Sequence, residues 1–111
     1  MGGAKGLANP STIRFTQSSV SASFKDGRLL QETIDALRSG KLSPNDLPPI
    51  RTFLQDGFTF TLDNRRLFAA SQAGVGVKTV PATTEEVAKE SWKFTTPNRG
   101  TYVCVKGGCV E

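Results

Sequence analysis

The residues best suited to chemistry in this chain lie together in one short turn, formed by Asp63, Asn64, Arg65 and Arg66. The turn follows the alternating stretch 58–62 and precedes an alanine-rich stretch, which predicts a strand that ends and a helix that begins. Backbone N–H groups at the start of a helix lack partners within the helix and carry partial positive charge. The sequence therefore predicts an anion-binding turn, with Asp63 or Asn64 as the helix cap.

Two arginines in the first turn of a helix are repelled by the helix dipole, so a negative partner is expected beside them. That partner is either an external phosphate, which the planar guanidinium binds through two oxygens, or the chain's own Asp63 in a structural ion pair. In the phosphate interpretation, Arg65 and Arg66 bind the phosphate and stabilise developing charge. Asp63 orients an arginine or holds a divalent metal such as Mg²⁺.

A second wall of the site is expected from polar residues outside this turn. Threonines near position 95 also suit a turn or a helix cap. With histidine absent, the only candidates for a general base nearby are Asp63, Asp26 and Glu32. The predicted catalytic residues are Asp63, Arg65 and Arg66, and the predicted ligand-binding residues are Gln17, Ser18, Asn64, Arg65, Arg66 and Thr95.

Composition excludes several classes of chemistry. The chain has no histidine, which rules out histidine triads, histidine bases and most zinc sites built by this chain alone. Cys104 and Cys109 are too few to complete a zinc site, and they suit either a disulfide or two ordinary thiols. A net charge of +4 favours anionic partners. Because no apolar run approaches about 18 residues, no membrane insertion by this domain is expected.

The length of 111 residues fits one domain. Residues 1–11 are glycine-rich and indicate a linker or a cloning remnant, and residues 12–111 are expected to form a single domain. The patterns predict strands at 13–17, 50–54, 58–62, 76–80 and 101–105, with a polar loop at 18–23. Helices are predicted from Asp26-Gly27 to Gly40, over 65–73, and from the capping box 83–86 to Trp92 or Phe94. The fold class is therefore α+β, with a small mixed β-sheet and about three helices.

This order of elements resembles the ParB amino-terminal/sulfiredoxin-like fold over Ile13 to Pro81. The resemblance is carried by Leu47–Arg51, the Asp56-Gly57 hairpin, Leu62–Leu67 and Ala73–Val75. It implies that Arg65 and Arg66 hold nucleotide phosphates. Asp63 replaces the usual glycine of the family, Asn64 stands at the reactive cysteine of sulfiredoxin and Arg65 at its histidine, so sulfiredoxin chemistry is not expected.

Three further strings are similar to the carboxy-terminal tips of bacterial polymorphic toxins of the Rhs or contact-dependent inhibition type. They are Phe15–Val20, Leu62–Leu67 and Trp92–Asn98. This resemblance implies a longer natural protein, with Met1 as an added start. It also implies secretion as part of a larger effector, delivery into the cytoplasm of a target bacterium, and a cognate immunity protein as partner.

Three functional hypotheses remain open at this point. The first is an effector toxin that acts on nucleic acid or a nucleotide, as a nuclease or nucleotide hydrolase. The second is a non-catalytic module that binds a nucleotide or nucleic acid. The third is a structural protein-interaction domain. Phe58 and Phe60 alternate on one strand face that continues into Leu62, which favours core packing over the stacking of bases.

Overall fold

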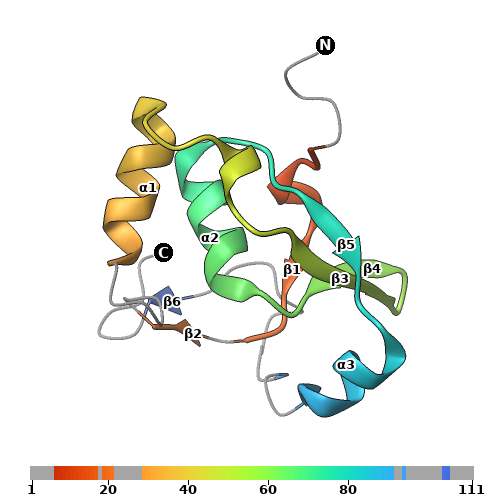
Figure 1. Cartoon of the computed structure of the whole chain (residues 1–111). Coiled ribbons are helices and arrows are strands. Elements are labelled where there is room, and N and C mark those ends of the chain that lie inside the picture. The colour runs from red at the N-terminus through yellow and green to blue at the C-terminus, as the bar shows by residue number, and fades with distance from the viewer. Residues whose placement is uncertain (1–6, 18, 22–28, 92–93, 95–103, 106–111) are drawn as a thin grey trace.

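The computed structural model describes residues 7–17, 19–21, 29–91, 94 and 104–105. It is a small α+β domain with a four-stranded mixed sheet in the order β1-β4-β3-β5 and three α-helices, so the predicted fold class is confirmed (Figure 1). The strands of this sheet are β1 (Arg14–Phe15), β3 (Ile50–Gln55), β4 (Phe58–Thr61) and β5 (Thr79–Pro81). The helices are α1 (Leu30–Ser39), α2 (Asn64–Ala73) and α3 (Thr84–Lys89).

The centre of the sheet is the predicted hairpin of β3 and β4. The two strands are antiparallel, with Phe53 opposite Phe60. Asp56 and Gly57 join them, and both have positive φ angles, of 54° and 83°. Two consecutive left-handed residues give a turn whose twist matches that of the strands, which is why an Asp-Gly pair is favoured there. The local sequence therefore specified this hairpin correctly.

The outer strands are shorter than the alternation predicted. β1 keeps only two residues and lies parallel to β4, and β5 lies parallel to β3. The predicted strand 76–80 begins late because Val77 pairs instead with Ala8, through N–O distances of 2.8 and 3.0 Å. A 3₁₀-helix follows Ala8 at Pro10–Thr12. Residues 7–11 therefore belong to the fold, and the predicted linker 1–11 extends too far into the chain.

A second, two-stranded sheet forms where a loop was predicted. β2 (Ser19–Val20) pairs in parallel with β6 (Cys104–Val105). The prediction of a loop over 18–23 was therefore wrong at these two residues. A polar, serine-rich segment shows little strand character by itself, and its pairing depends on a partner more than 80 positions away in the sequence.

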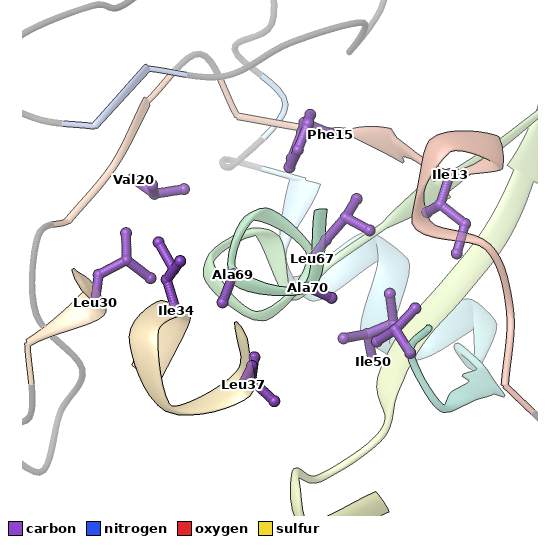
Figure 2. Close-up of a cluster of buried hydrophobic side chains, with 11 residues drawn as sticks. Ile13, Phe15, Val20, Leu30, Ile34, Leu37, Ile50, Leu67, Ala69 and Ala70 are labelled. Atoms are coloured by element: carbon purple, nitrogen blue, oxygen red, sulfur yellow. The ribbon is translucent and has the colours of Figure 1, made fainter. Parts of the chain in front are cut away.

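The main core lies around helix α2, with α1 packed along its side (Figure 1). Both helices end at the predicted glycines, Gly40 and Gly74, which have the left-handed φ angles of 84° and 71°. Glycine adopts this conformation without a steric penalty, so it ends a helix readily. Figure 2 shows the buried side chains between the helices and strands, which are Ile13, Phe15, Val20, Leu30, Ile34, Leu37, Ile50, Leu67, Ala69, Ala70 and Val77.

The other face of the sheet carries aromatic side chains. Phe53 stacks on Phe60, with ring centroids 5.9 Å apart, and on Phe94, with centroids 5.5 Å apart. Because side chains alternate along a strand, Phe53 points away from the face on which Ile50 meets the core around α2. Phe60 is buried, which confirms its predicted packing role. Phe58 is half-buried beneath the guanidinium of Arg14, 3.9 Å from the ring centroid.

Helix α3 begins as predicted and ends early. Its capping box is confirmed: Glu86 N donates to Thr83 Oγ1 at 3.0 Å, and Thr83 N donates to Glu86 Oε1 at 2.9 Å. The helix ends at Lys89, so Phe94 lies beyond it. Among the residues that the structure describes, no helix has the length and apolar character needed to cross a membrane.

Candidate anion site at the start of helix α2

Hydrogen bonds from β3 and β4 fix the turn that precedes α2. Asp63 N donates to Thr61 Oγ1 at 3.0 Å, and this hydroxyl donates to Arg51 O at 2.9 Å. Leu62 N donates to the same carbonyl at 3.0 Å. Helix α2 then starts with the bond from Leu67 N to Asp63 O, at 3.2 Å. The position of the predicted anion turn is therefore set by the central hairpin.

Asn64 is an internal anchor. Its side chain is buried, and its Oδ1 accepts hydrogen bonds from Thr16 N at 2.8 Å and Gln17 N at 3.3 Å. Its Nδ2 donates to Thr16 Oγ1 at 3.0 Å, and that hydroxyl donates to Thr61 O at 2.9 Å. The carboxamide thus joins the end of β1 to the start of α2. Its atoms are occupied by protein groups, so the structure does not support Asn64 as a phosphate ligand.

Gln17, a predicted wall residue, is brought beside the turn by this anchor. Its backbone N–H is directed at Asn64, and the residue is half-buried. The other predicted wall residues, Ser18 and Thr95, lie outside the described residues, as do Asp26 and Cys109. The question of a disulfide between the two cysteines therefore also lies outside them.

Asp63 occupies the N-cap position of α2, but its carboxylate is directed elsewhere. Among the described residues its side chain makes no capping hydrogen bond. Instead Oδ2 accepts from Arg51 N at 2.7 Å and Arg51 Nε at 3.1 Å, and Oδ1 accepts from Arg51 Nη2 at 2.8 Å. Burial acts to raise the pKa of Asp63, but the hydrogen bonds from Arg51 and the charges of Arg66 and Arg51 outweigh it, and the pKa is lowered.

This environment argues against two predicted roles of Asp63. A general base must take up a proton readily, whereas these contacts stabilise the charged carboxylate. A metal ligand needs carboxylate oxygens that face the ion, whereas both oxygens of Asp63 face guanidinium nitrogens. Within the described part of the chain, no group of three or more His, Cys, Asp and Glu side chains could hold a metal ion. Glu32, another candidate base, caps α1 by accepting from Leu29 N at 3.0 Å.

Arg51 is the central ion-pairing residue of this region, and the sequence interpretation missed it. Its guanidinium also donates to Glu90 through Nη1 and Nη2, the latter at 3.1 Å, and to Glu86 at 3.4 Å. The hydrogen bonds of Asp63 and Glu90 raise the pKa of Arg51 above its ordinary value, so its charge is permanent. A charged residue inside a predicted strand, with glutamates four positions apart on a predicted helix, was the available signal. Neither pattern identifies the partner.

Arg66 makes fewer and longer hydrogen bonds than Arg51 among the described residues. Its Nη2 lies 3.3 Å from Asp63 Oδ1 and 3.4 Å from Pro49 O, which are both long contacts. Its Nε is buried and has no hydrogen-bond partner among the described residues. The side chain is 27% exposed. Arg65 lies in the same helical turn and is half-buried. The structure thus brings Asp63 and Arg66 together at the start of α2, and Arg51 on β3 contacts Asp63.

The fold and this turn define the chain as a small α+β domain whose central hairpin presents an arginine-bearing helix start. No protein-family model, no curated protein and no solved structure matches the chain.

Proposed function

We propose that this domain binds a phosphate-bearing ligand, a nucleotide or a nucleic acid, at the start of α2. One observation carries the proposal: the guanidinium of Arg66 stands at a helix start that the carboxylate of Asp63 does not cap. Its Nε has no partner among the described residues, and a buried N–H without a partner costs about 1–3 kcal/mol. The Arg66 side chain as a whole is 27% exposed, so an incoming phosphate oxygen can reach its exposed part and would gain from the helix dipole.

In this proposal Arg66 is the principal phosphate ligand, and Arg65 adds positive charge in the same turn. Asp63 and Asn64 support the site through their internal contacts. The ParB/sulfiredoxin-like order of elements, with its phosphate-binding arginine turn, is consistent with this assignment. The similarity to polymorphic-toxin tips further suggests that the ligand is the target of an antibacterial effector, which a cognate immunity protein would neutralise in the producing cell.

Catalysis on that ligand, as a nuclease or nucleotide hydrolase, is the enzymatic form of the proposal. A binding module without chemistry is the second candidate, and a specific observation favours it. The carboxylates described around the turn, Asp63, Glu86 and Glu90, all contact Arg51. A carboxylate held by a guanidinium is a weak base, so the described residues supply phosphate binding more readily than proton transfer.

Ligand titration with matched charge variants tests the binding proposal. ATP, GTP, a short RNA and a short DNA are titrated into the domain with and without Mg²⁺, and heat or tryptophan fluorescence is recorded. Arg66→Ala should weaken binding by about 10–100-fold, since a hydrogen bond to a charged group contributes about 1.5–3 kcal/mol. Arg38→Ala removes the same charge from the exposed face of α1 and should leave affinity within about twofold.

Absence of saturable binding to all four ligands, or equal effects of the two alanine variants, would refute the phosphate site. Product analysis of the same mixtures separates the two candidate functions. Turnover that Arg66→Ala abolishes supports the enzyme, and binding without turnover supports the module. Expression inside bacteria tests the effector role: growth arrest by the parent domain and normal growth with Arg66→Ala are expected.

A further inference from the structure

The side chain and the backbone of Arg51 together hold one carboxylate. Both oxygens of Asp63 are engaged, Oδ2 by the backbone N and Nε of Arg51 and Oδ1 by its Nη2, over 2.7 to 3.1 Å. The Asp63 side chain is 10% exposed, so water screens these contacts only weakly. These hydrogen bonds from the backbone and the side chain of Arg51 fix the direction in which the carboxylate points.

An aspartate at the N-cap position normally does something else. Its carboxylate accepts a hydrogen bond from a backbone N–H in the first turn of the helix, and its charge compensates the dipole. Asp63 makes no such bond within the described residues. An arginine three positions later, Arg66, would also be a natural ion-pair partner. It obtains only a 3.3 Å contact with Oδ1, which Arg51 Nη2 approaches to 2.8 Å.

We infer that Arg51 is a positioning residue of the proposed anion site: it holds the Asp63 carboxylate, so that Asp63 does not cap α2 and Arg66 keeps only one long contact with it and can take up the ligand. This inference rests on the proposed function. Without Arg51, the released carboxylate would act as an internal competitor for the same positive groups that a phosphate would contact.

The surroundings of Arg51 suit this role better than a role as ligand. Glu86 in α3 and Glu90, the residue that follows the helix, contact the same guanidinium as Asp63, so three carboxylates share one cation. A phosphate approaching Arg51 itself would meet their negative charge. Arg51 therefore affects the ligand through Asp63. The contacts with Glu90 and Glu86 hold its guanidinium in the orientation that grips Asp63.

Affinity for inorganic pyrophosphate, measured by NMR titration, tests the inference on four proteins: the parent domain, Arg51→Gln, Asp63→Asn and the double variant. Arg51→Gln should lower the affinity by about tenfold, because Asp63 then has Arg66 as its closest cation and pairs with it more tightly. The double variant carries no carboxylate at position 63 and should recover to within about threefold of the parent. Arg51→Lys keeps the charge but loses the fork, and should lie between the parent and Arg51→Gln.

Recovery of affinity in the double variant is the decisive result when circular dichroism shows that Arg51→Gln is as fully folded as the parent at the titration temperature, because removing both members of a buried ion pair can also restore a lost fold. An Arg51→Gln domain that binds as tightly as the parent, or a double variant as weak as Arg51→Gln, overturns the inference. If Arg51→Gln does not fold, the comparison of Arg51→Lys with Arg51→Lys/Asp63→Asn decides by the same criterion.

A measurement without ligand separates this inference from the proposed function. Released from Arg51, the carboxylate should shift the backbone amide resonances of Arg65 and Arg66 in the first turn of α2, and the double variant should reverse the shift. A parent domain that ignores pyrophosphate but shows this reversible shift refutes the phosphate site and keeps the competition between Arg51 and the helix start. Unchanged amide resonances in Arg51→Gln overturn the inference whatever the parent binds.

Discussion

Replacing Asn64 with alanine tests the most consequential long-range contact in the structure. The side chain is 2% exposed and joins residues separated by 48 positions in the sequence. Asn64→Ala leaves the buried Thr16 N without an acceptor, which costs about 1–3 kcal/mol. The longer bond from Gln17 N, at 3.3 Å, lies nearer the surface and adds about 0.5–1 kcal/mol. The expected loss is therefore about 1.5–4 kcal/mol.

The free energy of unfolding, measured by urea denaturation with circular dichroism, checks this magnitude. A loss of this size corresponds to a melting temperature lower by about 6–17 °C for a domain of this length. Gln72→Ala changes an exposed side chain of the same helix and should alter stability by less than about 0.5 kcal/mol.

An Asn64→Ala domain with the stability of the Gln72→Ala control would refute the anchor role. It would also reopen the possibility that the carboxamide of Asn64 serves a ligand. The aspartate variant adds a further check, because a carboxylate at position 64 accepts both N–H bonds but cannot donate to Thr16 Oγ1 when charged. Asn64→Asp is therefore expected to destabilise the domain at neutral pH.

Two other predictions concern charge and core packing. The folded pKa of Asp63 is lowered, so its stabilising contribution is complete above the unfolded value of about 3.9 and is lost as pH falls through the folded value. The free energy of unfolding of the parent should therefore fall more steeply below about pH 4 than that of Asp63→Asn, and matching slopes would contradict this. Leu67 in α2 is 0% exposed, so Leu67→Ala should lower the free energy of unfolding by about 2–5 kcal/mol. Leu54 is 77% exposed, so Leu54→Ala should lower it by less than about 0.5 kcal/mol. Urea denaturation of both variants measures the difference, and comparable losses would show that Leu67 does not belong to the core.

Much of the local architecture could be predicted because its causes are short-range. The hairpin at Asp56-Gly57 needs two left-handed residues between alternating strands, and the helix ends at Gly40 and Gly74 need one such residue each. The capping box from Thr83 to Glu86 is likewise complete within four residues. Each of these signals can be evaluated from neighbouring side chains alone, so the sequence was sufficient.

The sequence predicted where the candidate site lies, but it predicted the roles of the residues in that site only partly. The turn from Asp63 to Arg66 begins a helix, as expected. The sequence indicated Asp63 or Asn64 as its cap and Asn64 also as a ligand. In the fold the Asp63 carboxylate pairs with Arg51 instead, and Asn64 is buried against Thr16. Both outcomes depend on which strands become neighbours, and propensities of single residues do not contain that information.

By itself, the sequence determined the class of fold, the hairpin, the helix ends and the presence of two arginines at one helix start. Only the tertiary structure decided which of several possible cations takes the Asp63 carboxylate. Asp63 has an arginine three positions later in its own helix, yet its closer partner is Arg51, twelve positions earlier on β3. The pairing of β3 with β4 sets Arg51 N and its guanidinium against both carboxylate oxygens at once. A partly buried, doubly bonded ion pair outcompetes a neighbour in sequence that can offer only one long contact.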